Sequence, residues 1–245
     1  MFDTARRMQF PFMAGSSLPL TWRFPPLELP HDCEIESALS IGYGGLEAYG
    51  LRALEILQCM IERRNGGETG VASVQAVQGD AMWNAERQGL WSRELLEAAL
   101  QVMPDVKTGR PEDLFSDNAA VYLIEYRDGL RTAVIMANDM LESWGFAVNL
   151  KGELEPSVSQ FKTQEDEPYV HFAYLVEAIE HMIRTGQPPY PVERTLLTTG
   201  ILDRVMHSLA ADGQRLTTPE LDVCYELVDW HFANHPKSSL TLSSD

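Results

Sequence analysis

A glycine-rich turn followed at once by a charged helix is the part of the sequence best suited to hold a polar ligand. Residues 40–57 indicate the end of a strand, a turn with glycines at 42, 44 and 45, and a long helix with one apolar face. The glycines let the backbone turn sharply and let a ligand approach closely. Glu47 and Arg52 lie near the start of that helix. The alternative is a packed helix with an ordinary solvated face, which pattern alone favours.

Other residues capable of chemistry lack the spacing of a known site. The sequence has no G-x-G-x-x-G after a predicted strand and no G-x-x-x-x-G-K-[ST], so it carries no recognisable phosphate cradle of its own. Ser16 and Ser17 lack the G-x-S-x-G pattern of a serine nucleophile. His231 and His235 are one helical turn apart but have no His-Glu-x-x-His motif, and we expect no metal site.

Size, charge and cysteine content restrict the class of protein. With 245 residues, 44% of them hydrophobic, the chain can form one large domain or two small ones. A net charge of −17 argues against nucleic acid and against an anionic membrane surface as partners. No apolar run approaches the roughly 20 residues that span a bilayer. Three widely spaced cysteines without a C-x-x-C motif indicate reduced thiols, and we expect a cytoplasmic protein.

The elements that would position the glycine turn predict an α+β fold, an open and mostly antiparallel sheet with helices packed on one face. The clearest signal is a hairpin, because two β-prone runs flank Asp128-Gly129, a pair that tolerates positive φ. Ser92 is a good N-cap for a helix that starts at Arg93. The remaining expected strands are 34–41, 71–77, 144–150 and 156–162, and the other helices are 80–85, 172–183, one from Pro191 and one over 219–233.

The first stretch of the chain is typical of the end of a preceding domain. Residues 2–8 indicate the tail of an amphipathic helix and residues 10–15 a short buried strand, which is half of an α/β crossover unit. We therefore expect Met1 to be an internal methionine of a longer reading frame. The predicted organisation is a domain remnant with a linker over 1–30, an α+β domain over 31–237 and a flexible tail over 238–245.

Residues 42–57 resemble the glycine turn and following helix of the Gfo/Idh/MocA family, the glucose–fructose oxidoreductase and inositol dehydrogenase group. Residues 189–202 look like the late P-V helix of that family, preceded by an F-x-x-x-V-x-A-I helix at 172–179. Residues 12–17 resemble the last strand of its Rossmann domain and the exit to the second domain. The resemblance covers most of the chain.

This resemblance implies the C-terminal substrate-binding and oligomerisation domain of an NAD(P)-dependent oxidoreductase acting on a sugar, polyol or related metabolite. In the family an N-terminal Rossmann domain binds the nicotinamide cofactor, and the C-terminal α+β domain supplies substrate and subunit contacts. The glycine fingerprint and the Glu-Lys-Pro lysine of that family are missing here. NAD or NADP is therefore implied by the family only. We expect neither to bind this chain alone, and we expect the chain to be inactive alone.

The family's catalytic His falls on Arg52 and its Asp on Ala48, with Glu47 one residue away. An arginine cannot transfer protons near neutral pH because its pKa stays above about 12, but it can clamp a carboxylate or phosphate. We expect Arg52 to anchor charge and Glu47 to be the nearby carboxylate that could move protons. The other residues that the resemblance implies in substrate binding are Tyr43, Tyr49, Ser16, Ser17 and Arg23.

A different class of function remains open from the sequence. The chain could be a non-catalytic ligand-binding or assembly module that dimerises through its sheet. An apolar outer face on the 121–136 hairpin would favour that alternative. A homo-oligomer formed through the sheet is also what the family resemblance implies.

Overall fold

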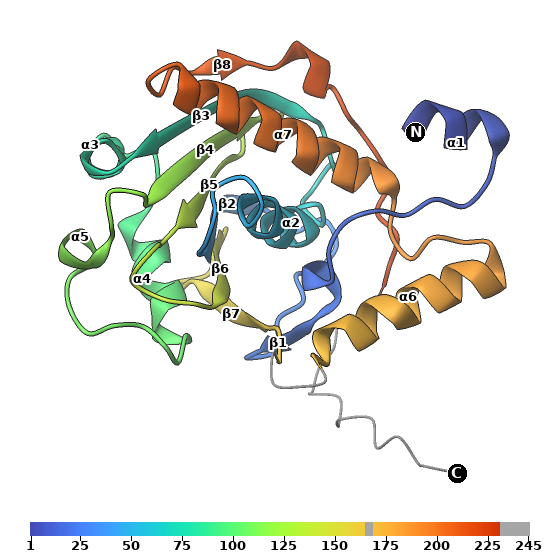
Figure 1. Ribbon diagram of the computed structural model, residues 1–245, viewed down its shortest axis with the longest axis horizontal. Helices are drawn as coiled ribbons and strands as arrows, with labels where there is room; N and C mark the ends of the chain where they lie inside the picture. Colours follow the sequence, from blue (N-terminus) through green and yellow to red (C-terminus); the bar gives the residue numbers. More distant parts are fainter. Residues whose placement is uncertain (165–168, 231–245) are drawn as a thin grey trace, which may run out of the picture.

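An open sheet of eight strands organises the chain in a computed structural model that describes residues 1–164 and 169–230 (Figure 1). The spatial order is β1-β7-β6-β2-β5-β4-β3-β8. The strands are β1 (Trp22–Phe24), β2 (Ile35–Gly42), β3 (Val71–Gln78), β4 (Ala120–Tyr126), β5 (Arg131–Met136), β6 (Trp144–Leu150), β7 (Ser157–Lys162) and β8 (Leu216–Thr217). The α+β class and the open, mostly antiparallel sheet are confirmed.

The β4–β5 hairpin forms where the Asp-Gly pair predicts it. Gly129 has φ +90°, a conformation that favours glycine, and the Asp128 carboxylate accepts a hydrogen bond from the backbone N–H of Leu130 at 3.0 Å. The two strands pair antiparallel from Ala120 opposite Met136 to Glu125 opposite Arg131. The turn chemistry alone therefore specifies this part of the sheet.

One pairing decides where the functional residues lie. β2 and β5 run parallel, and they are the only parallel neighbours among the strands that the structure describes. Their carboxyl ends consequently meet at one edge of the sheet, where the Ala137 N–H donates to the Gly42 carbonyl at 2.7 Å. The glycine turn after β2 and the segment after β5 thus lie side by side.

Helices cover both faces of the sheet, so the expectation that they pack on one face is wrong. On one face, α2 (Gly50–Ile61) and α7 (Val192–Ala210) form the larger core with the strands. On the other, α3 (Asp80–Arg87) and α4 (Arg93–Gln101) form a second core. Central strands such as β5 are buried along almost their whole length, and alternate side chains point to opposite faces, so each face needs a cover.

The second core covers the surface that dimerisation through the hairpin would need. Val121, Ala133 and Ile135 point to this face, and none is more than 2% exposed because α3 and α4 pack over them. Ser92 caps α4 as predicted, since its hydroxyl accepts a hydrogen bond from the Leu95 N–H at 3.2 Å. The short helix α5 (Pro111–Leu114) follows, in a segment for which the sequence predicts neither a helix nor a strand.

The two ends of the chain differ from expectation in three places. α1 (Phe2–Met8) is a helix, but residues 10–15 form no strand. β1 pairs with β7, so the sheet already begins inside the stretch 1–30 that the sequence assigns to a remnant and linker. After the 3₁₀ turn η2 (Pro219–Leu221), residues 222–230 form no helix; the predicted tail at 238–245 lies outside the described residues.

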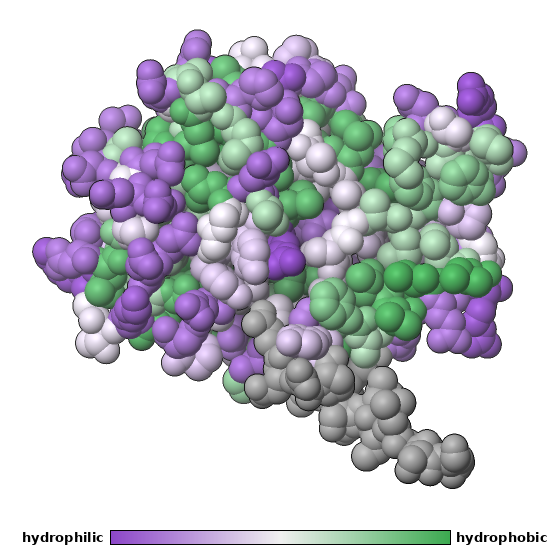
Figure 2. Space-filling view, in the orientation of Figure 1, coloured by the Kyte–Doolittle hydropathy of each residue, from purple (hydrophilic) through white to green (hydrophobic). Residues whose placement is uncertain are grey.

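One further helix stands at the side of the molecule opposite α3, α4 and α5. α6 (His171–Thr185) ends at Gly186, which has φ +72° as the C-cap, and it packs beside η1 (Leu18–Leu20). Apolar side chains gather over α6 on the face shown in Figure 2, and Ile183 is 73% exposed. In the described part of the chain, no helix combines the length and apolar composition that crossing a membrane requires.

Candidate functional site

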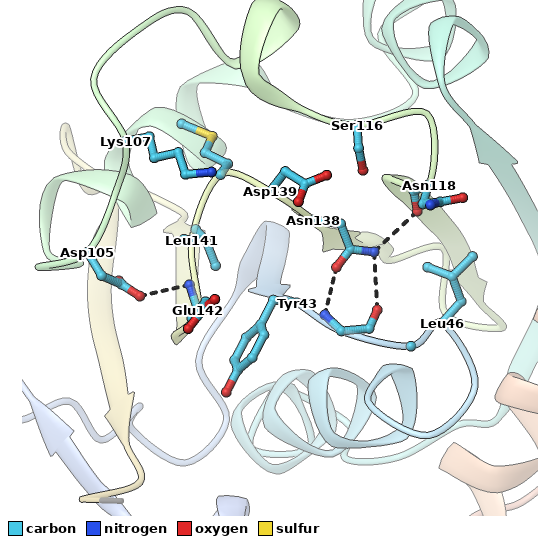
Figure 3. A pocket seen from close by; sticks show the side chains of 13 residues that line it. Tyr43, Leu46, Asp105, Lys107, Ser116, Asn118, Asn138, Asp139, Leu141 and Glu142 are labelled. Atoms are coloured by element: carbon cyan, nitrogen blue, oxygen red, sulfur yellow. Dashed lines mark hydrogen bonds between the residues drawn. The ribbon is translucent and has the colours of Figure 1, made fainter.

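A pocket of about 790 Å³ opens beside the glycine turn, at the shared carboxyl ends of β2 and β5 (Figure 3). This volume lies within the range of roughly 300–1,000 Å³ typical of small-molecule sites. One wall is the turn itself, residues 43–46. The others come from the segment between α4 and β4 and from the residues after β5. They are Asp105, Lys107, Ser116, Asn118, Asn138, Asp139, Met140, Leu141 and Glu142.

Asn138 fastens the glycine turn to the end of β5. Its Oδ1 accepts a hydrogen bond from the Gly44 N–H at 2.6 Å, and its Nδ2 donates to the Gly44 carbonyl at 3.1 Å and to the Asn118 carbonyl at 3.3 Å (Figure 3). Only an amide side chain offers an acceptor and two donors at once. The shape of the pocket wall therefore depends on this one residue.

The rest of the pocket is rich in hydrogen-bonding groups. The Asp105 carboxylate accepts from the Glu142 N–H (2.7 Å) and from the Ser143 hydroxyl (2.6 Å), so it mainly holds the 142–143 turn. Within the described residues, neither Lys107 nor Asp139 forms an ion pair, and the buried Ser116 hydroxyl has no hydrogen-bond partner. The pocket thus offers cationic, anionic and neutral polar groups to a ligand.

An aromatic cluster supports the start of α2 next to this pocket. The Tyr43 ring centroid lies 5.5 Å from that of Tyr49 and 5.0 Å from that of Trp144, and Tyr49 stacks on Trp144 at 5.8 Å with 17° between the planes. The Arg52 guanidinium carbon lies 4.4 Å from the centroid of the Tyr49 ring. Because Tyr43 also lines the pocket, it joins the cluster to the pocket.

Two glycines of the turn make room for these rings. A Cβ at Gly42 would lie 2.5 Å from Cζ3 of Trp144, and a Cβ at Gly44 would lie 2.7 Å from Cδ1 of Tyr49. Gly44 also has φ +85°, which disfavours any other residue. The sequence predicts a sharp turn and a close ligand at these glycines; at Gly42 and Gly44 the side chains of Trp144 and Tyr49 approach the backbone.

Ser16 meets the same helix one turn further along. Its hydroxyl donates to the Glu55 carboxylate at 2.5 Å and its N–H donates at 3.0 Å. Glu55 is 1% exposed, and its burial raises the pKa of the carboxyl group despite these hydrogen bonds. Glu55 follows Arg52 by one turn, so Ser16 lies near the cluster but is bonded to the protein rather than open to the pocket.

The other predicted site residues lie apart. Ser17 is buried, and Arg23 is buried with its guanidinium donating to the carbonyls of Pro19 (3.2 Å) and Leu27 (3.1 Å). Glu47 is exposed on the turn before α2 and is not part of the pocket wall. The structure therefore brings together Tyr43, Tyr49 and Arg52, with Ser16 beside them.

Charged residues at the C-terminal end of α2 form ion pairs with other residues of the chain. Glu62 forms a buried ion pair with Arg194 of α7 and accepts a hydrogen bond from the Tyr225 hydroxyl at 2.8 Å. Arg64 pairs with the buried Glu68 at 3.2 Å and with Asp128 at 2.6 Å. These groups hold α2, α7 and the segment after η2 together, and their charges are paired with one another.

Comparisons with known proteins give distant structural likeness only. No protein-family model matches the chain, and no curated protein matches it. Among solved structures it is similar to GenD2 from gentamicin A biosynthesis in complex with NAD, at 14% identity and TM-score 0.46, covering 75% of this chain and 55% of that one. It is also similar to scyllo-inositol dehydrogenase from Lactobacillus casei with bound NAD(H) and scyllo-inositol, at 10% identity and TM-score 0.46, covering 75% and 56%.

A putative myo-inositol dehydrogenase from Sinorhizobium meliloti is a third example, at 11% identity and TM-score 0.44, covering 75% and 57%. Two of these three structures carry the name of an inositol dehydrogenase, and all three are similar to this chain at 14% identity or less. This chain spans a little more than half the length of each.

Proposed function

We propose that this chain is the substrate-binding part of an NAD(P)-linked oxidoreductase that acts on a sugar, polyol or related metabolite. One observation carries the proposal: the pocket beside the glycine turn is lined by several hydrogen-bonding side chains, among them Lys107, Asp139 and Asn118. That turn is also the segment in which the sequence resembles the family. The pocket adds residues that the resemblance does not involve, because its other walls come from residues 105–118 and 138–142.

The chemistry of the pocket suits a ligand with many hydroxyl groups. Hydroxyls both donate and accept, so they can pair with the Lys107 ammonium, the Asp139 carboxylate and the Ser116 hydroxyl at the same time. Tyr43 adds an aromatic residue to the wall of the same space. A ligand without polar groups would leave these groups unsatisfied, which is costly in a partly enclosed site.

A nicotinamide dinucleotide does not fit the residues of this turn. Both backbone groups of Gly44 are bonded to Asn138, and Gly42 and Gly44 are packed against aromatic rings, so the turn presents no free cradle to a pyrophosphate. We propose that the cofactor is held by another domain or chain. Of the residues considered for proton transfer, the exposed Glu47 is the one carboxylate beside the start of α2, and its role stays part of this proposal.

The direct test is ligand binding to the purified chain by titration calorimetry. myo-Inositol and sorbitol are expected to bind saturably, and Lys107→Met is expected to weaken binding severalfold by removing one donor. Lys151→Met is the matched control, because Lys151 is exposed and pairs with Glu34 at the opposite end of β2. Titration with NADH should give no saturable signal. Polyols that fail to bind, or that bind equally to all three proteins, would contradict the proposal.

Assembly through the sheet stays the alternative function. Since α3 and α4 already cover the outer face of the hairpin, such an assembly would have to use the sheet edges β1 and β8. Light scattering coupled to size-exclusion chromatography measures the mass directly. A monomer of 27.5 kDa across the micromolar range would remove this alternative.

A further inference from the structure

The Arg52 guanidinium is held in a fixed position at the start of α2. It stacks on the Tyr49 ring at 4.4 Å, and that ring is itself fixed by Trp144 and by the backbone of Gly44. Trp144 is 2% exposed and therefore belongs to the core. Stacking uses the flat face of a guanidinium and leaves the N–H groups along its edge free to donate hydrogen bonds.

In the part of the chain that the structure describes, this guanidinium has no ion-pair partner, although it attracts the Glu55 carboxylate one turn further along the helix. This is so although the protein carries 36 acidic residues against 19 basic ones. The carboxylate next to it along the helix, Glu55, accepts hydrogen bonds from Ser16, and burial raises its pKa, which disfavours the charged form. Arg64 and Arg194, by contrast, are each paired with buried carboxylates.

Arg52 does not line the pocket, but its guanidinium carbon lies 4.4 Å from the Tyr49 ring centroid, which is 5.5 Å from that of Tyr43, so it is no more than about 10 Å from a ring that does. Tyr49, on which it stacks, is in contact with Tyr43, and Tyr43 lines the pocket. The half-buried position of Arg52 reduces screening by water, so an anion bound there would gain more than it would from an exposed side chain. Lys107, a second cation without an ion pair in the described residues, lines the pocket itself.

We infer that the substrate combines a hydroxyl-rich body with one oxyanion group, and that Arg52 binds this group. The inference rests on the proposed function, since it names the chemical class of the ligand for the same site. A planar carboxylate fits the edge of a guanidinium with two parallel hydrogen bonds, and a phosphate can be held in the same way. Arg52 is therefore a specificity-determining residue that selects a sugar acid or polyol phosphate over the neutral polyol.

The experiment compares ligands that differ only in this group. Sorbitol, gluconate and sorbitol 6-phosphate are titrated calorimetrically into the wild-type chain and into Arg52→Gln. We expect at least one of the two anions to bind about tenfold or more tightly than sorbitol, because charge-assisted hydrogen bonds are the stronger ones. The substitution should abolish that preference and leave sorbitol affinity within about twofold. Which anion is preferred distinguishes a carboxylate from a phosphate.

Two further variants keep the result unambiguous. Arg131→Gln is the matched control, because Arg131 is exposed at the opposite end of β5 from the pocket. Arg52→Lys retains the charge without the two-bond geometry and should keep only part of the preference. Thermal unfolding checks that each variant is folded. Sorbitol binding with no anion preference, or with a preference unaffected by Arg52→Gln, overturns this inference alone; no binding of any of the three ligands overturns the proposed function as well.

Discussion

The charged side chains at the two ends of α2 differ in whether they form ion pairs. At its last turn, Glu62 is buried and paired with Arg194, and the neighbouring Arg64 is paired with both Glu68 and Asp128. At its first turn, Arg52 rests on an aromatic ring and has no ionic partner in the described part of the chain. The same helix thus carries a closed polar network at one end and an open cation at the other.

This difference separates charges that maintain the fold from charges available to a ligand. Buried charged groups must be paired and hydrogen-bonded, because an isolated ion in a protein interior is very costly. A half-buried cation can remain unpaired only because water reaches it, and it can exchange that water for a ligand. The closed network is expected to control stability, and the open end is expected to control binding.

Breaking the buried ion pair between Glu62 and Arg194 should have the largest effect on stability. Arg194→Met leaves the Glu62 carboxylate buried without its cation, and we expect the free energy of unfolding to fall by about 3–5 kcal/mol, measured by urea denaturation. The double variant Arg194→Met with Glu62→Leu removes both charges and should recover a large part of that loss. A single variant that unfolds within 1 kcal/mol of wild type would show that the closed network is not what stabilises this end.

The second largest effect is expected from a substitution that displaces Tyr49, the ring on which Arg52 stacks at the first turn of α2. Gly44→Ala forces a Cβ into the Tyr49 ring at a backbone φ of +85°, and we expect about 1–3 kcal/mol lower stability together with weaker polyol binding. For stability, Gly45→Ala is the matched control, since a Cβ there meets nothing within 4 Å. Equal effects of the two substitutions would argue against the packing of Tyr49 on Gly44.

A smaller effect is expected when the hydrogen bonds by which Asn138 joins the glycine turn to the end of β5 are altered. Asn138→Asp keeps the acceptor for the Gly44 N–H but removes the donor to the Gly44 and Asn118 carbonyls, at a cost of about 1–2 kcal/mol. Sorbitol binding should weaken several-fold in calorimetry, because the pocket wall loosens. Asn149→Asp, on β6 away from the pocket, should leave binding unchanged.

The smallest expected effect is a pH dependence of stability caused by Glu55, which lies in α2 between its first and last turns. Its folded-state pKa is raised by burial, so the folded protein holds this proton more tightly than the unfolded chain. The resulting stability is fully present below the ordinary glutamate pKa of 4.5 and is lost as the pH rises through the folded-state value. Relative to Glu55→Gln, wild type should therefore lose stability over the pH range above 4.5. A difference between the two proteins that stays constant over this range would contradict the raised pKa.

Much of the fold could be predicted from local sequence patterns. The Asp128-Gly129 turn, the Ser92 cap and the Gly186 helix end each depend on the conformational preferences of a few adjacent residues. The helix expected over 219–233 does not form in its described part, residues 222–230. There the Tyr225 hydroxyl bonds to Glu62, a long-range contact that no local pattern predicts.

In the candidate site, too, some features follow from local sequence and others depend on the tertiary structure. The sequence by itself determined a glycine turn that leads into a helix with Tyr43, Tyr49 and Arg52 close together, because those residues are neighbours along the chain. Only the tertiary structure decided that Asn138 and Trp144 join them, since this depends on β5 pairing parallel to β2 and on β6 lying at its other side. It also decided that Ser16 is bonded to Glu55 and that Arg23 is buried. Periodicity within a segment shows which side chains face inward, but which polar groups meet there depends on segments far apart in sequence.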